Sequence, residues 1–166
     1  MKGSEYRRIK GSAYTRREYI HGVPPPRLSK HTMGNLKGKF DYKVSMTALR
    51  DVQIRHNALE AARVAVNKVL FDKLGETGYR LRVKVYPHQV LRENKMMAFA
   101  GADRIQEGMR KSFGVPIGTA ARVRINQPIM TAEINADAVE AAKEALMQGF
   151  SKLPTPCKIE VKKIAA

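Results

Sequence analysis

The sequence predicts an α+β fold in which two helices pack on one face of a mostly antiparallel sheet. Two stretches, near 57–75 and 136–152, place apolar residues at helical spacing. Other stretches, most clearly 79–87, alternate apolar with polar residues, as strands with one buried face do. The helices are separated by several strands, an order that favours the α+β class. A chain of 166 residues fits one domain with extensions.

Residues 1–40 are expected to form an irregular basic extension. They hold ten lysines and arginines against two glutamates, so half of the net charge of +16 lies in less than a quarter of the chain. The triple proline at 24–26 favours an extended path over a helix. Tyr6, Tyr14 and Tyr19 give this segment more aromatic character than a solvated tail needs, although such a tail is the alternative interpretation.

The domain proper is expected over residues 41–166 and to open with one or two strands. In the helix that follows, Asn57 is the expected cap and Glu60 its capping-box partner. Gly75 or Gly78 is expected to end this helix. Helical spacing predicts that its apolar face comprises Ala58, Ala61, Ala62, Ala65, Val66, Val69 and Leu74.

The second half of the domain is predicted to supply most of the sheet. The stretch 79–87 alternates apolar residues with cations, which predicts a strand with a strongly basic outer face. The remaining elements are predicted as a weaker strand at 88–99, strands at 119–126 and 128–134 joined at Asn126 and Gln127, a helix at 136–152 capped by Asn135, and a strand at 156–164.

The charge indicates the class of partner. A net charge of +16 and a pI near 10.2 cause self-repulsion that nucleic acid or an anionic membrane would offset. No apolar run is long enough to span a membrane, and the N-terminus lacks the apolar region of a secretory signal. The apolar stripes of both helices are rich in Ala and Val, which is typical of domain core rather than of membrane-surface helices. We therefore expect an intracellular protein that binds nucleic acid and not a membrane.

The reactive residues form no recognisable catalytic or metal-binding pattern. The four histidines lack metal-ligand spacing, and a single cysteine, Cys157, excludes an intramolecular disulfide and a cysteine-based zinc finger. Cys157 lies in an alternating strand, where a buried structural thiol is expected. His56, at a strand-to-helix junction, is expected to make local hydrogen bonds. These patterns predict no enzyme, no cofactor and no metal.

The glycine-rich stretch 98-AFAGADRIQEGMRKSFGVPIG-118 fails the template of a phosphate-binding loop. Asp103 occupies the position at which that loop needs its first glycine. Four glycines and a proline disfavour a stable helix or strand, so a long loop that orders against a partner is predicted. Arg104, Arg110 and Lys111 could pair with phosphates there, and Phe113 could stack on a base. The alternative is an ordinary mobile surface loop.

Cations on the outer faces of the strands predict a second basic surface. Contacts of this kind with a nucleic-acid backbone depend steeply on salt and carry little sequence information. The chain shows no helix-turn-helix or basic-zipper pattern, so RNA is favoured over a DNA groove. The residues of this surface are Arg80, Arg82, Lys84, Arg122 and Arg124.

Three runs carry a resemblance to a known family: 14-YTRREYIHGVPPP-26, 51-DVQIRHNALEAARVAVNKVL-70 and 100-AGADRIQEGMR-110. Together they resemble the archaeal and eukaryotic large-ribosomal-subunit protein ten-e family, the counterpart of bacterial large-subunit protein sixteen. The similarity covers essentially the whole chain, and the first run is typical of the archaeal form.

The resemblance implies a structural, rRNA-binding constituent of the large ribosomal subunit with an α/β-hammerhead type of fold. It places such a protein near the peptidyl-transferase centre and the aminoacyl-tRNA site, with the internal loop, residues 101–115 here, directed at tRNA. Glu107, Lys111 and Val115 depart from the usual loop pattern of the family. The implied partners are large-subunit rRNA, tRNA and neighbouring ribosomal proteins in the cytoplasm, without homo-oligomers. The alternative is an RNA-binding assembly factor or chaperone acting off the ribosome.

The expected contacts fall into two groups. The residues expected to bind RNA are Arg7, Arg8, Lys10, Arg16, Arg17, Arg27, Lys30, Lys37, Lys39, Arg55, His56, Arg80, Arg82, Lys84, Arg92, Lys95, Arg122 and Arg124. The residues expected in the loop near tRNA are Arg104, Gln106, Met109, Arg110, Lys111 and Phe113.

Overall fold

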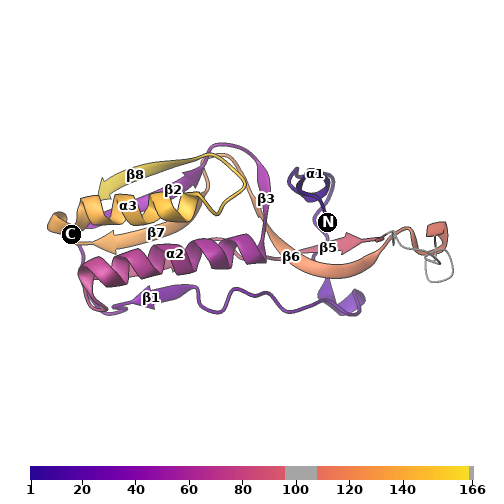
Figure 1. Cartoon of the computed structure of the whole chain (residues 1–166), viewed down its shortest axis with the longest axis horizontal. Coiled ribbons are helices and arrows are strands. Elements are labelled where there is room, and N and C mark those ends of the chain that lie inside the picture. The colour runs from indigo at the N-terminus through magenta and orange to yellow at the C-terminus, as the bar shows by residue number, and fades with distance from the viewer. Residues whose placement is uncertain (96–107, 165–166) are drawn as a thin grey trace.

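The computed structural model describes residues 1–95 and 108–164, and its helices and antiparallel strands confirm the α+β class (Figure 1). The helices are α1 (Gly3–Tyr6), α2 (His56–Leu74) and α3 (Val139–Phe150), with short 3-10 turns η1 (Arg17–Tyr19), η3 (Gly108–Lys111) and η4 (Ala136–Ala138). The strands are β1 (Thr32–Gly34), β2 (Tyr42–Ala48), β3 (Val52–Arg55), β4 (Tyr79–Val83), β5 (Gln89–Glu93), β6 (Val115–Val123), β7 (Pro128–Ile134) and β8 (Cys157–Lys163).

A five-stranded antiparallel sheet in the order β1-β4-β7-β2-β8 carries both long helices on one face (Figure 1). The register of β4 and β7 sets Tyr79 opposite Ile134 and Leu81 opposite Ala132. Because side chains alternate between the two faces, this register sends all four to the helix side, where they are buried. The helices contribute Leu59, Ala62, Val66, Leu70, Ala142, Ala145 and Leu146 to the same core.

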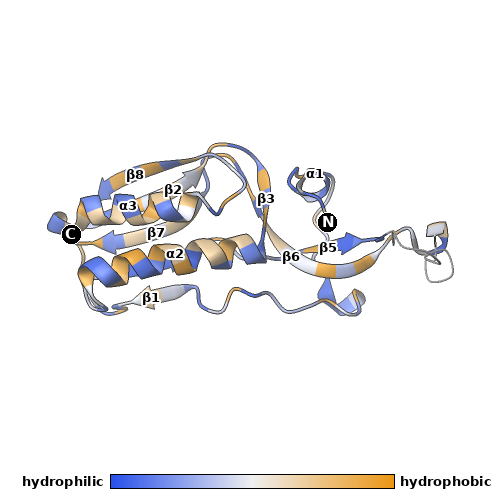
Figure 2. Ribbon diagram, in the orientation of Figure 1, coloured by the Kyte–Doolittle hydropathy of each residue, from blue (hydrophilic) through white to orange (hydrophobic). Residues whose placement is uncertain are grey.

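The first long helix forms as predicted but buries a partly different stripe. Leu59 and Leu70 are fully buried, whereas Ala61 is exposed. Burying a leucine removes more apolar area from water than burying an alanine, so the helix turns its leucines toward the sheet. The small residues that were predicted remain part of this face, since Ala62 and Val66 are fully buried. Figure 2 shows hydrophilic and hydrophobic residues alternating along both long helices.

The helix boundaries fall within a few residues of the prediction. Arg55, rather than Asn57, is the N-cap residue of α2, and Gly75 ends the helix with a φ of 68°. Asn135 precedes the turn η4, which leads into α3. Within the described ranges, no helix is long and apolar enough to cross a membrane.

A second, three-stranded sheet in the order β3-β6-β5 extends beyond the helices (Figure 1). The single sheet expected from the sequence is therefore wrong, because the chain passes between the two sheets at four connections. Two of them, from β2 to β3 and from β6 to β7, are tied together: Asn126 N–H donates to the carbonyl of Ala48 at 2.8 Å, and Ile125 N–H donates to Asp51 at 2.8 Å. The predicted turn is confirmed, with Asn126 at a φ of 62°. Strand β6 begins at Val115, four residues earlier than predicted.

The N-terminal extension is mostly irregular, as predicted, but it is bound to the domain along its main chain. Gln53 N–H donates to the carbonyl of Arg7 at 2.7 Å. The side-chain amide of Gln53 donates to the carbonyls of Tyr6 and Arg8 at 2.7 and 2.9 Å. Further along, β1 pairs with β4 at the edge of the five-stranded sheet. The extension therefore has a defined path on which its cations are displayed.

Candidate nucleic-acid interface

The face of the five-stranded sheet opposite the helices carries a cluster of cations. Arg80 and Arg82 lie on this face because Leu81, between them, is buried against the helices. Lys43 of β2 is a cross-strand neighbour of Lys162 of β8. We call this surface the basic sheet face, and its residues are Lys43, Arg80, Arg82, Lys84, Lys158 and Lys162, interspersed with Ser45, Thr47 and Thr131.

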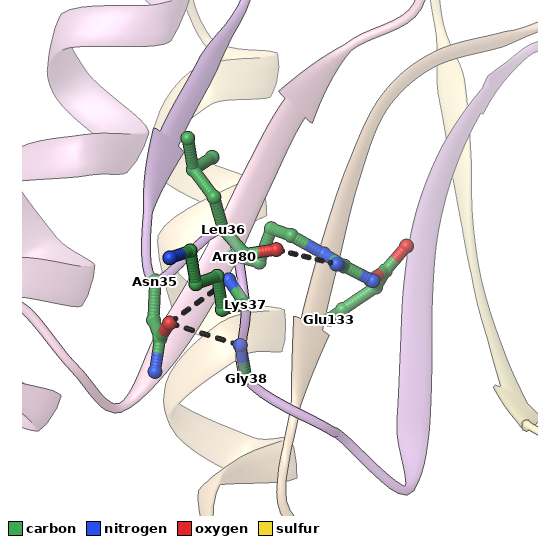
Figure 3. Close-up of polar contacts among 6 residues, drawn as sticks. All are labelled: Asn35, Leu36, Lys37, Gly38, Arg80 and Glu133. Atoms are coloured by element: carbon green, nitrogen blue, oxygen red, sulfur yellow. Dashed lines mark hydrogen bonds and ion pairs between the residues drawn. The ribbon is translucent and has the colours of Figure 1, made fainter.

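Arg80 is neutralised within the fold (Figure 3). Its guanidinium forms an ion pair with Glu133, directly across the strand pair. It also donates to the carbonyl of Leu36 at 3.1 Å and lies 5.9 Å from the centroid of the Phe40 ring. These contacts give Arg80 a structural role at the edge of the basic sheet face, and its contact with RNA stays a prediction.

The segment that crosses beside Arg80 is shaped by Asn35 (Figure 3). Its side-chain oxygen accepts hydrogen bonds from the N–H groups of Lys37 and Gly38, at 3.1 and 2.9 Å. A turn of this kind is the usual local use of an asparagine side chain. It leaves the side chain of Lys37 exposed.

Three other cations of the basic sheet face, Lys43, Arg82 and Lys84, have no ion pair with a carboxylate in the described part of the chain. Partial burial lowers the pKa of Lys84, and the nearby charges of Arg82 and Lys43 lower it further. The three cations therefore repel one another. An anion placed among them would offset that repulsion and raise the pKa of Lys84 again.

A hydroxyl group lies unused within this cluster. Thr131 is 1% exposed, and its Oγ1 has no hydrogen-bond partner among the described residues. It sits between Ser45 and Arg82 on the neighbouring strands. Buried polar groups are nearly always paired, so this hydroxyl is an exception within the sheet. Because it is buried, contacts to phosphate oxygens on this face would come from the cations.

The cations of the extension lie outside, although their main chain is held. Tyr6, Arg7 and Arg8 offer their carbonyls to the domain, and none of the arginine side chains there is buried. The exposed side chains comprise every extension residue that was predicted to bind RNA: Arg7, Arg8, Lys10, Arg16, Arg17, Arg27, Lys30, Lys37 and Lys39.

Arg92 anchors the base of the internal loop. Its guanidinium lies 3.2 Å from the centroid of the Phe113 ring and 4.8 Å from that of Tyr14, and it donates to the carbonyl of Phe113. The two rings meet edge to face at 5.9 Å. This cluster joins the extension, β5 and the end of the loop, and it engages the guanidinium of Arg92 in contacts within the protein.

Other arginines predicted to bind RNA also have partners in the fold. Arg122 donates to the carbonyl of Gly11 at 2.8 Å, and Arg124 pairs with Asp51 at 3.1 Å. Arg55 lies 5.5 Å from the ring of Tyr6, while its buried Nε has no partner among the described residues. Their contacts with RNA stay predictions.

His56 has the local role expected of it. It is 5% exposed, and its Nδ1 accepts a hydrogen bond from the N–H of Arg27 at 3.0 Å. Burial lowers the pKa of His56, and the charges of Arg55 and Arg27 lower it further. The imidazole is therefore held neutral, as an acceptor.

Two residues of the predicted loop set, Arg104 and Gln106, lie outside the described residues. Met109, Arg110 and Phe113 are exposed, Met109 by 84%. The main chain of Lys111 closes the turn η3. Lys95, at the other end of the loop, is exposed as well.

The described residues offer little for catalysis. They contain no cluster of three or more His, Cys, Asp or Glu side chains able to hold a metal ion. Burial raises the pKa of Cys157 to about 11, so this half-buried thiol is protonated near neutral pH, as expected of a structural cysteine.

Several residues of the basic sheet face were not predicted from the sequence. The signal for Lys43 and Ser45 was present, because they alternate with Val44 and Met46 along β2. Thr131 carried no such signal, since the neighbours that give it significance come from other strands.

The comparisons with known proteins agree with one another. Residues 9–160 match the family described as Ribosomal protein L16p/L10e. The chain is 58% identical to the large ribosomal subunit protein uL16 of Hyperthermus butylicus, over 91% of this chain and 84% of that protein. It is 55% identical to uL16 of Staphylothermus marinus, over 95% and 90% of the two chains. It is 54% identical to uL16 of Sulfolobus acidocaldarius, over 96% and 92%.

Proposed function

The chain belongs to the family of ribosomal proteins L16p/L10e and is a structural constituent of the large ribosomal subunit, and we propose that it binds rRNA there through the basic sheet face and residues 1–40. The resemblance seen in the sequence, including its archaeal character, is confirmed by these relatives. Its place is accordingly the ribosome of the cytoplasm.

The observation that carries the rRNA proposal is the set of cations that have no acidic partner among the described residues. Lys43, Arg82 and Lys84 lie together on a sheet face that neither α2 nor α3 covers. Such an arrangement suits a phosphate backbone, whose charge offsets the repulsion among the cations. The extension supplies further exposed cations on a fixed main-chain path, so residues 1–40 would act as an rRNA-binding extension of the domain at 41–166.

The loop at 101–115 is proposed to reach the aminoacyl-tRNA site near the peptidyl-transferase centre. Support comes from its described end, where Met109, Arg110 and Phe113 are exposed and Arg92 fixes the base. Arg104, Gln106 and Lys111 complete the proposed set of contacts. The protein would act as a single copy beside neighbouring ribosomal proteins, without a catalytic role.

The test compares two variants of equal charge. One replaces Lys43, Arg82 and Lys84 by glutamine, and the other replaces the α2 lysines Lys68 and Lys73 together with Lys152. Binding of the full chain to large-subunit rRNA is measured over a range of salt concentrations. Removing cations that touch phosphates should lower the slope of log affinity against log salt by about one for each lost contact.

The control variant should keep the slope of the wild type, although it carries the same net charge as the test variant. Equal slopes for the two variants would contradict the proposal for the basic sheet face. Retention on large subunits after a high-salt wash distinguishes a ribosomal constituent from an assembly factor acting off the ribosome, which the wash would remove.

A further inference from the structure

The alternation of β4 continues past the end of the strand and changes in character. Val83 and Val85 are buried, whereas Lys84, Tyr86 and His88 are exposed. The outward side chains along this line therefore pass from cations to aromatic rings. A surface that offers cations for phosphates and rings for bases is typical of binding to unpaired RNA.

Three rings lie in series at this place, the first pair stacked and the second tilted. The centroids of His31 and Tyr86 are 5.3 Å apart with their planes at 21°, and those of Tyr86 and His88 are 4.6 Å apart with their planes at 46°. Tyr86 is 40% exposed and His88 is exposed too. Rings that served only the core would be covered, so this series presents stacking surface to solvent.

Main-chain contacts hold the rings in position. Val83 N–H donates to the carbonyl of His31 at 2.7 Å, which ties the first ring to the end of β4. His88 N–H donates to the carbonyl of Tyr86 at 3.0 Å, which fixes the third ring relative to the second. Because the rings are ordered in advance, little side-chain entropy would be lost when a ligand stacks on them.

A cavity of about 410 Å³ lies beside two of these rings. Tyr86 and His88 line it together with Gln89, Arg122 and the extension residues Ala13 and Thr15. The side-chain oxygen of Gln89 accepts the N–H of Tyr14 at 2.8 Å, while its amide nitrogen donates to no described residue. The cavity thus combines stacking rings, an amide donor and a guanidinium.

We propose that Tyr86 and His88 form a stacking platform for an unpaired RNA base, with the Gln89 amide facing the edge of the base and Arg122 facing its phosphate. His31 supports Tyr86 from behind, since it stacks on that ring but does not line the cavity. This inference rests on the proposed rRNA binding and adds to it a contact with a base, which the charge of the basic sheet face does not supply.

The experiment uses two eight-nucleotide probes of equal charge: an oligoadenylate and its abasic counterpart. The full chain should bind the base-bearing probe roughly tenfold more tightly than the abasic one, because a stacked base adds affinity that phosphates do not. Tyr86→Leu and His88→Ala, made separately, should bring the two affinities together and leave binding of the abasic probe unchanged. Phe71→Leu, which removes a ring that is 52% exposed on α2, is the matched control and should keep the difference.

Each outcome has a distinct meaning. Equal affinities for the two probes in the wild type, or a difference that survives in His88→Ala, would overturn the platform and leave the rRNA proposal standing. Failure of both probes to bind would overturn the platform and the rRNA proposal together. Since His88 is exposed, its replacement tests the idea even if Tyr86→Leu does not fold. An upfield shift of the His88 ring protons in the NMR spectrum, seen with oligoadenylate only, would report the stacked base directly.

Discussion

The two faces of the five-stranded sheet are built from the same strands and behave in opposite ways. On the helix side, Tyr79, Leu81 and Val83 of β4 are buried beneath α2 and α3. On the other side, Arg80 and Arg82 of the same strand lie among further cations. One strand thus supplies apolar burial to the fold and cations to the surface, simply because its side chains alternate.

This difference separates stability from binding residue by residue. Burial of apolar area accounts for most of the free energy of folding, so the helix side should carry the stability. Cations that have no acidic partner in the described part of the chain add repulsion instead, and an anion that binds to the basic sheet face would stabilise it. Of two substitutions at neighbouring residues of β4, one should therefore change the free energy of unfolding and the other the binding of RNA.

The largest expected effect is on the helix side. Leu81→Ala should lower the free energy of unfolding by about 2–5 kcal/mol, because Leu81 is fully buried and its removal leaves a cavity. Chemical denaturation followed by circular dichroism measures this change. At a temperature where the variant remains folded, the salt slope of its RNA binding should equal that of the wild type.

The matched partner of this variant is Arg82→Gln, at the next residue. It should change the free energy of unfolding by no more than about 0.5 kcal/mol, as surface substitutions usually do. If Arg82→Gln proved as destabilising as Leu81→Ala, it would be wrong to assign stability to the helix side and binding to the basic sheet face.

An intermediate effect is expected where the two roles overlap, at Glu133. Glu133→Gln removes the carboxylate that pairs with Arg80, and among the described residues it leaves the guanidinium with the carbonyl of Leu36 and the ring of Phe40. The free energy of unfolding should fall by about 1–3 kcal/mol, the usual range for a hydrogen bond to a charged group. RNA affinity should not fall, because the surface becomes more positive. Glu140→Gln, in an exposed pair with Lys143 on α3, is the control and should have little effect.

The alternation of β4 shows what a sequence can establish alone. Period-2 spacing predicted both the buried and the basic side of this strand, because the spacing is a local property of an extended chain. The same reasoning predicted both long helices, and it missed Leu59 and Leu70 only because small residues at neighbouring positions fit a helical stripe equally well.

What the sequence could not provide was the order of the strands. Lys43 and Lys84 are neighbours on the basic sheet face only because β2 and β4 both pair with β7. The division into two sheets depends likewise on long-range contacts, such as the one between Asn126 and Ala48. The ion pair of Arg80 was hidden for the same reason, since its partner lies on another strand.

The smallest expected effect concerns pH and again separates the two faces. His56, at the start of α2, is buried as a neutral acceptor, and burial followed by the charges of Arg55 and Arg27 lowers its pKa below the ordinary value of 6.5. The unfolded chain therefore takes up this proton first as the pH falls, so the contribution of His56 to stability is complete above pH 6.5 and is lost toward the lowered pKa.

Thermal unfolding followed between pH 7 and about 5 should show a falling Tm in the wild type and a smaller fall in His56→Gln, whose side-chain oxygen can still accept the N–H of Arg27. Carboxyl groups with a lowered pKa, such as Glu60, make stability depend on pH only below their ordinary pKa of 4.5, which lies outside this window. A Tm that falls equally in both proteins would show that His56 is not held neutral. Lys84 stays charged throughout this range, although its pKa is lowered too. The group whose protonation lowers stability, His56, therefore lies on the helix side, and the cation proposed to bind RNA lies on the opposite face.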